Sequence, residues 1–370
     1  MKEKLKISFP GYKIIDGYIL RKFLGTYLFS IALITVILVV FDYAERVDSF
    51  TESHAPWSAI IFDYYLNYVP EFITQFSGLF TFISVIFFTS KMAYQTEIIA
   101  ILSGGVSFRR LMWPYFLGAF AIMSLSLSLN LWIIPPSQVN CVNFKRAYFK
   151  KYKNEQFDRH IYRQIAPNEY VYVRGFDNDN SAEFFTLERY EGTELRHTLE
   201  ASGVTVDPKT NRWTAQRYIT RSIDENGQEE FNQYRDLDTV INLDVRELGR
   251  VAETVKTMKI GELNDFLRQQ RKKGSDSINI IAVAQHTRFS YPMATFILTL
   301  IGVSLSSRKV RGGTGLHIGI GITLCFSYIM FNRVFEEFAK SGTLPVWLAV
   351  WMPNIIFAVI AVYLYRKAPK

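Results

Sequence analysis

Long apolar segments separated by polar ones dominate this chain. Each of the six longest lacks any Asp, Glu, Lys or Arg, and about 20 apolar residues suffice to cross a hydrocarbon core roughly 30 Å thick. These segments are Phe23–Phe41, Phe72–Ser90, Leu111–Ile134, Phe289–Ser307, Gly312–Asn332 and Thr343–Tyr365. The pattern predicts six transmembrane helices, and therefore a polytopic α-helical membrane protein.

Charge in the connecting segments sets the expected orientation of these helices. The amino-terminal segment, "RKVRGG" at 308–313 and the final "YRKAPK" are basic, whereas Asp42–Asp63 is acidic and carries a single arginine, Arg46. Because cytoplasmic loops of membrane proteins carry an excess of Lys and Arg, we expect both termini in the cytoplasm. The net charge of +8 is then explained by the cytoplasmic side of a membrane protein, and no nucleic-acid partner is expected.

The polar segment between the third and fourth apolar segments is too long and too charged to be a loop. It holds more than half of the charged residues of the chain. Stretches such as "EYVYVRGF" and "NRWTAQRYITRSI" are rich in β-branched and aromatic residues and are bounded by turn residues, which is typical of short strands. Residues 135–258 therefore predict an inserted all-β, jellyroll-like domain on the outer, periplasmic side.

The segments on either side of this domain complete the expected organisation. Residues 259–277 predict an amphipathic connecting helix, with Ile260, Leu263 and Leu267 on one face. Residues 1–134 are expected to hold transmembrane helices 1–3, with a cytoplasmic coupling helix at about 94–105, and residues 278–370 to hold helices 4–6.

Motifs for nucleotide hydrolysis and metal binding are missing from the sequence. No G-x-x-x-x-G-K-[ST] occurs, and no histidine has a Glu or a second His four residues away. The pair Glu336 and Glu337 makes an intramembrane hydrolase one alternative, but such an enzyme needs metal ligands on neighbouring helices. We therefore interpret the pair as a solvated helix end near Arg333 and Lys340. No catalytic residue, no metal site and no cofactor bound by this chain are expected.

Polar residues inside the spans bear on a second alternative, a stand-alone ion-coupled carrier. Such a carrier needs ionisable groups within its spans, and the six segments contain no Asp, Glu, Lys or Arg. His317 and Asn332 lie within the fifth segment, where hydrogen bonding to a neighbouring helix is favoured over lining a substrate path.

The segment "YQTEIIAILSGGVSFRRLMWPYF" at 94–116 lies between the second and third spans. Thr96–Leu102 predicts a short surface helix that ends at Gly104 and Gly105, and Ser107 is a suitable cap for the next helix. Apolar residues at 98, 99, 101 and 102 are unexpected in a plain connector that faces water. We therefore interpret this helix as a docking element.

A basic cluster follows the third span. Its members are Lys145, Arg146, Lys150, Lys151 and Lys153. One interpretation is the solvated face of a helix leaving the membrane, and the other is a site for an anionic lipid head group.

The docking segment resembles the lipopolysaccharide-export permeases, the LptF/LptG (YjgP/YjgQ) family. The resemblance covers the whole chain. Two segments, "SSRKVRGG" and "LPVWLAVWMPNIIFAVIAVYLYRK", resemble LptG more than LptF. It is carried most specifically by "E-x-x-A-x-x-S-G-G-x-S-x-R-R", whose matching positions are Glu97, Ala100, Ser103, Gly104, Gly105, Ser107, Arg109 and Arg110.

The resemblance implies a non-catalytic half-transporter in the bacterial inner membrane. A second LptF/LptG-type permease, an LptB-type ATPase dimer that binds ATP and Mg, and an LptC-type partner are implied. Lipopolysaccharide would enter laterally through gates formed by spans one and five and then pass to the β domain. Glu97 would reach an arginine of the ATPase, and the other matched residues would support that coupling.

One departure from the family concerns lipid phosphates. The family has basic residues at the outer mouth of span one, where this chain has Asp42, Glu45 and Asp48 with only Arg46. Phosphate contacts are therefore expected to involve Lys145 and Arg146 in addition to Arg46.

Overall fold

The computed structural model describes residues 13–149, 157–176, 180–207, 210–224, 227–241, 243, 251–272, 275, 277–307 and 313–368. The chain forms two compact units. The first comprises Met1–Glu45, Tyr68–Ile134 and Gln285–Lys370, and the second comprises Arg46–Asn67 and Pro135–Ala284. Each unit is described by itself below.

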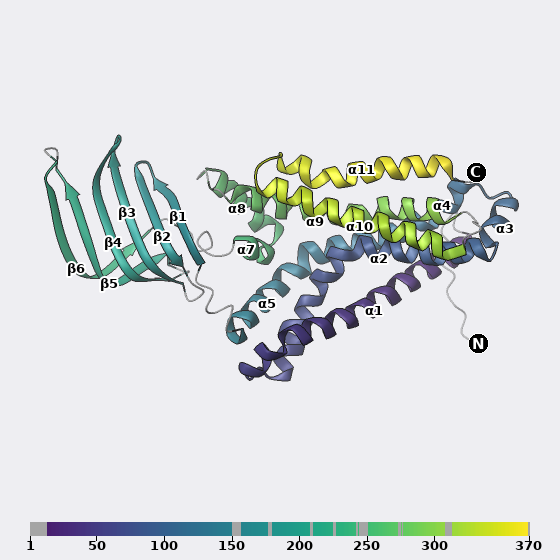
Figure 1. Ribbon diagram of the computed structural model, residues 1–370, viewed down its shortest axis with the longest axis horizontal. Coiled ribbons are helices and arrows are strands. Elements are labelled where there is room, and N and C mark those ends of the chain that lie inside the picture. Colours follow the sequence, from purple (N-terminus) through teal and green to yellow (C-terminus); the bar gives the residue numbers. More distant parts are fainter. Residues whose placement is uncertain are drawn as a thin grey trace. The chain divides into compact units, whose positions relative to one another are not determined.

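Five helical stretches among the described residues are long and apolar enough to cross a membrane (Figure 1). They correspond to five of the six expected spans. In chain order they are α1 (Ile14–Glu52), π-helical η1 with α2 (Ala59–Tyr65 and Leu66–Tyr94), α4 with η2 and α5 (Phe108–Ser128, Leu129–Ile133 and Ile134–Tyr148), α9 (Ile278–Ser306) and α11 (Val346–Lys367). The prediction of a polytopic helical membrane protein is confirmed.

The sixth expected span, Gly312–Asn332, falls in helix α10 (Gly313–Lys340). α10 is 28 residues long. At its start, the side chains of 313, 314 and 316–318 are outside the described residues, and His317 is among them.

One close helix–helix approach in the first unit joins α1 and α4. The Phe23 ring of α1 lies so near Gly118 of α4 that a Cβ at position 118 would come within 2.4 Å of the ring. Phe23 is fully buried, and its centroid is 5.7 Å from that of Phe88 on α2. Small residues at such crossings let helix backbones approach in a membrane, where dispersion contacts replace the hydrophobic effect.

A buried polar cluster links α9, α10 and α11. The Asn354 amide donates to the Ser290 carbonyl (3.0 Å) and hydroxyl (2.8 Å), and its oxygen accepts a hydrogen bond of 2.9 Å from Tyr328. The Ser290 hydroxyl also donates to the carbonyl of Val350. Hydrogen bonds of this kind satisfy polar groups that lipid cannot solvate.

The second unit contains a six-stranded antiparallel sheet in the order β1-β2-β3-β4-β5-β6. The strands are β1 (Phe157–Ala166), β2 (Glu169–Phe176), β3 (Ser181–Glu191), β4 (Glu194–Asp207), β5 (Arg212–Ile223) and β6 (Glu229–Val240). Alternation along β2 buries Val171 and Val173, and these pack with Phe185, Trp213 and neighbouring apolar residues. The prediction of an inserted β domain is confirmed, but residues 135–148 and 251–257 of the segment expected to be all-β are helical.

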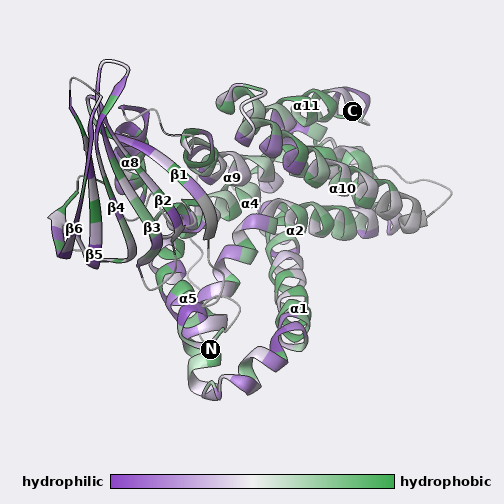
Figure 2. Cartoon of the chain, turned by 60° about the vertical axis from the view of Figure 1, so that its left-hand side comes forward, coloured by the Kyte–Doolittle hydropathy of each residue, from purple (hydrophilic) through white to green (hydrophobic). Residues whose placement is uncertain are grey.

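The strand order adds a detail that the sequence pattern did not contain. Consecutive strands pair throughout, so the described part of the sheet is a meander. Greek-key crossings, which a complete jelly roll has, are not among the pairings of the described strands. Figure 2 shows the contrast in hydropathy between the mixed or polar strands and the largely apolar helices.

The shorter helices of the second unit follow the sheet in the chain. They are α7 (Val251–Thr257) and α8 (Ile260–Lys272). α8 buries Leu263, Phe266 and Leu267, so two of the three residues expected on its apolar face, Leu263 and Leu267, are buried.

Candidate functional site

The segment between α2 and α4 folds into the short helix α3 (Glu97–Ser103). Thr96 precedes it with a left-handed φ of 62°, and Gly105 follows it with φ 83°. The left-handed conformation favours glycine, which explains why a glycine stands at position 105. The Ser107 side chain accepts a hydrogen bond of 3.3 Å from the Arg110 amide and so caps α4, as the sequence predicts.

α3 has one buried and one exposed face. Ile98 is 1% exposed and packs into the apolar core of the first unit with Phe108 and Leu111. Ile99 is 46% exposed, and Ala100, Ser103, Gly104 and Gly105 are exposed beside it. Four of the expected coupling residues therefore form one accessible surface, which we call the α3 face: Ala100, Ser103, Gly104 and Gly105, together with Ile99.

Glu97 faces helix α1 as well as solvent. Its carboxylate accepts a 2.8 Å hydrogen bond from the Tyr18 hydroxyl and forms an ion pair with Lys22, whose Nζ lies 3.2 Å from Oε2 and 3.3 Å from Oε1. The Lys22 ammonium also lies 4.2 Å from the centroid of the Tyr18 ring. The side chain of Glu97 is 28% exposed. It is thus oriented by α1 while remaining accessible.

The two neighbouring arginines occupy different environments. Arg110 binds the Asp16 carboxylate of α1 through two hydrogen bonds, 2.7 Å from Nη1 and 2.5 Å from Nη2. The Asp16 side chain is 1% exposed and also accepts from the Lys13 amide at 2.7 Å. Arg109 is exposed. Arg110 is therefore held against α1, whereas Arg109 is accessible to a partner.

The residues expected at the lipid phosphate site lie on two elements joined by an aromatic cluster. Phe50 at the end of α1 contacts Phe144 and Phe149, with centroids 6.2 Å and 5.6 Å away. Arg46, one turn before Phe50, lies over the rings of Tyr64 and Phe149 at 6.0 Å and 5.3 Å. On α5, Lys145 is half-buried and Arg146 is exposed. Lys150, Lys151 and Lys153 lie outside the described residues.

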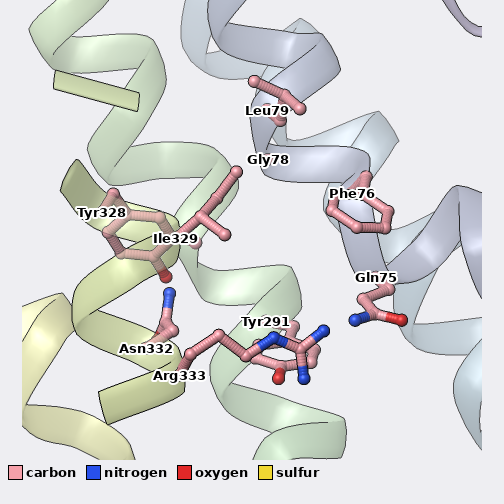
Figure 3. Close-up of a pocket in the computed structure, with 10 residues that line it drawn as sticks. Gln75, Phe76, Gly78, Leu79, Tyr291, Tyr328, Ile329, Asn332 and Arg333 are labelled. Carbon is pink, nitrogen blue, oxygen red and sulfur yellow. The ribbon is translucent and has the colours of Figure 1, made fainter. Parts of the chain in front are cut away.

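A small cavity lies between α2, α9 and α10 in the first unit (Figure 3). Gln75, Tyr291, Asn332 and Arg333 contribute polar groups to its lining. Its volume is about 40 Å³, enough for a few water molecules at roughly 10–15 Å³ each. A lipid with several acyl chains does not fit in this cavity, which also argues against reading it as an enclosed substrate chamber.

Glu336 corrects one sequence-based interpretation. It was expected at a solvated helix end, but it is 6% exposed and accepts a hydrogen bond from the Tyr291 hydroxyl of α9. The interhelical packing of α9 against α10 buries it. Arg333 lies 3.7 Å away as expected, and Glu337 pairs with Lys340 at 2.6 Å.

Metal-based hydrolysis at this position has no support in the described part of the chain. No group of three or more His, Cys, Asp or Glu residues there could hold a metal ion.

Sequence reasoning missed the α1 side of the site. Asp16, Tyr18 and Lys22 precede the first apolar segment and could be read only as ordinary charged and polar residues of a flanking region. The available signal was the spacing of Tyr18 and Lys22 at i and i+4, which places them on one helix face. The partners of these residues are 75 to 94 positions away.

Comparison with known proteins defines the class of protein. Residues 17–367 match the family described as "Lipopolysaccharide export system permease LptF/LptG". The chain is also 22% identical, over 369 residues, to an uncharacterized protein of Aquifex aeolicus (strain VF5), covering 96% of this chain and 99% of that protein.

The chain belongs to the LptF/LptG family of lipopolysaccharide-export permeases. It is a multi-pass membrane protein with an inserted β domain, and the resemblance noted from the sequence is confirmed.

Proposed function

We propose that this chain is the transmembrane permease subunit of an ATP-driven lipopolysaccharide exporter in the bacterial inner membrane. It extracts lipopolysaccharide from the outer leaflet through a lateral gate and passes it to the β domain on the periplasmic side. A separate LptB-type ATPase dimer binds ATP and Mg, and a second LptF/LptG-type permease and an LptC-type protein complete the assembly.

One observation carries this proposal beyond the family assignment. The α3 face is an accessible, largely apolar surface at a helix whose only charged residue, Glu97, is oriented by Tyr18 and Lys22. A preoriented, partly exposed carboxylate beside exposed apolar residues suits a protein partner that supplies a cation, because charge-assisted hydrogen bonds are the stronger ones. We assign that cation to an arginine of the ATPase.

The substrate site requires more than this chain. The cavity in Figure 3 holds only a few waters, and Leu28, Phe29, Leu33, Val36 and Phe41 of α1 leave large apolar side chains exposed. Both features support a chamber completed by a second permease. Arg46, Lys145 and Arg146 are the proposed phosphate contacts.

Co-purification with the ATPase tests the proposed docking. The complex carrying Glu97→Lys should lose most of its ATPase and with it the delivery of lipopolysaccharide to the outer membrane. Glu45→Lys, at an exposed position of α1, is the matched charge-reversal control and should retain the ATPase. Equal ATPase recovery from both variants would contradict the docking role of Glu97.

A further inference from the structure

We infer that Asp16, Tyr18 and Lys22 are positioning residues that make helix α1 move together with the docking helix α3. This inference rests on the proposed function and extends it. It assigns a coupling route within this chain, from the ATPase-binding surface to α1, whose apolar window is the least buried of the five candidate spans among the described residues.

The distribution of buried residues along α1 shows where this helix is held. In its first part Asp16, Ile19, Phe23 and Tyr27 are buried, whereas no residue from Leu28 through Phe41 is buried. Only 17% of the most apolar window of α1 is buried, compared with 61% for α2 and α9. Within the first unit, α1 is therefore most tightly packed near its first end, and beyond Tyr27 its contacts with the core involve partly buried residues such as Ile31 and Ile34.

The attachment has an apolar centre. Phe23 fits against Gly118 and the rings of Phe88 and Tyr115, at centroid distances of 5.7 Å and 6.3 Å. One turn later, the Tyr27 hydroxyl lies 3.0 Å from that of Ser77. Packed interiors resist compression, so this contact can act as a fixed point about which the rest of α1 changes its tilt.

The two polar links lie on the other side of that fixed point, between α1 and the α3–α4 segment. Asp16 binds Arg110 in the first turn of α4, and Lys22 with Tyr18 binds Glu97 in the first turn of α3. Two links at different heights on α1 restrain both position and rotation, which a single contact could not do. A displacement of α3 is therefore passed to α1 through these two links.

The two links differ in how easily they break. The Asp16 carboxylate is almost fully buried, and removing its bidentate partner would leave a buried charge with only the Lys13 amide as donor, so this link is costly to break. The Lys22–Glu97 pair is 33% and 28% exposed, and such pairs are weaker because water and salt screen them. This second link is the adjustable one.

Glu97 can contact α1 and the ATPase at the same time. A carboxylate has about four acceptor positions, and the Tyr18 hydroxyl and the Lys22 ammonium use three of them. An arginine from the partner can use the remaining position without displacing Lys22. Glu97 then acts as a bridge between the partner cation and α1.

The test measures lipopolysaccharide released per ATP hydrolysed by the complete transporter in proteoliposomes. Lys22→Met keeps the apolar stem and removes the charge, while the Tyr18 hydroxyl still orients Glu97. We therefore expect ATPase recovery to remain near wild type while lipopolysaccharide per ATP falls several-fold. Tyr18→Phe should cause a smaller fall. Arg21→Met, at the exposed neighbouring position, is the matched control and should behave as wild type.

A conservative variant separates a positioning role from general damage to the fold. Lys22→Arg restores a cationic donor and should recover most of the lost lipopolysaccharide-to-ATP ratio. The inference is overturned if Lys22→Met leaves this ratio unchanged, if the ratio falls only in proportion to lost ATPase, or if Lys22→Arg recovers nothing. The proposed function itself would fail differently, since then the wild-type complex would recruit no ATPase or release no lipopolysaccharide on ATP addition.

Discussion

The guanidinium of Arg110 binds the carboxylate of Asp16 through two hydrogen bonds across 94 residues of sequence. The Asp16 side chain is 1% exposed and that of Arg110 is 29% exposed. Because water hardly reaches the Asp16 carboxylate, its negative charge is stabilised mainly by Arg110. The relationship fixes the start of α1 to the start of α4. It also separates the roles of two adjacent arginines that look alike in the sequence.

The first prediction concerns these two arginines. Arg110→Met should lower the Tm of the purified chain in detergent by several degrees, because the buried Asp16 carboxylate then lacks its partner. Arg109→Met removes an exposed charge and should leave Tm close to wild type. Equal Tm values for the two variants, read from intrinsic fluorescence, would contradict the assigned difference.

The second prediction concerns the approach of α1 to α4. Gly118→Ala places a Cβ within 2.4 Å of the Phe23 ring, so the two helices must separate and the chain should be destabilised by about 1–3 kcal/mol. Gly25→Ala is the control, because a Cβ there meets nothing within 4 Å and alanine is the better helix former. Urea or heat unfolding in detergent compares them, and a Gly118→Ala chain as stable as Gly25→Ala would refute the close contact.

The third prediction concerns the polar cluster of α9, α10 and α11. Asn354→Leu removes three hydrogen bonds, to Ser290 and Tyr328, and should cost about 1–2 kcal/mol, since hydrogen bonds between membrane helices average near 0.6 kcal/mol and reach about 1.7 kcal/mol. Ser327→Ala loses a hydrogen bond that the Ser327 hydroxyl donates to the Thr323 carbonyl within the same helix. This substitution should change stability little. If both substitutions have the same effect on unfolding, the interhelical role of Asn354 is wrong.

The fourth prediction concerns the core of the β domain. Trp213 is fully buried and packs against Phe185 at a centroid distance of 4.9 Å, so Trp213→Ala should destabilise this domain by about 3–5 kcal/mol. Phe231 on β6 is 62% exposed, and Phe231→Ala should cost far less. Limited proteolysis of the full chain, followed at sites within 157–240, distinguishes the two. Similar cleavage rates would show that Trp213 does not belong to the core.

The sequence predicted the spans and the β insert because each depends on a local pattern. A charge-free segment such as Phe289–Ser307 must avoid water, and alternation such as that in "EYVYVRGF" buries one face of a strand. The helix Glu97–Ser103 was also predictable, since its end depends on Gly105 and its successor is capped by Ser107.

The pairings of the site were not predictable, because they depend on how distant segments pack. Glu97 could be recognised as a carboxylate in a docking segment, but nothing near it in the sequence indicates Tyr18 or Lys22. Glu336 was misread for the same reason. The charged residues near it in the sequence suggest a solvent-exposed helix end. The packing of α10 against Tyr291 of α9 buries it instead.

The most direct measurement for the central claim is ATP-dependent release of lipopolysaccharide from proteoliposomes. The vesicles contain this chain, the companion permease, the LptC-type protein and the ATPase, and a soluble β-jellyroll acceptor collects the product. We predict release that requires ATP and Mg, is independent of any ion gradient and is lost with Glu97→Lys. Release driven by a proton or sodium gradient without ATP, or equal release from Glu97→Lys and the wild-type chain, would contradict the account.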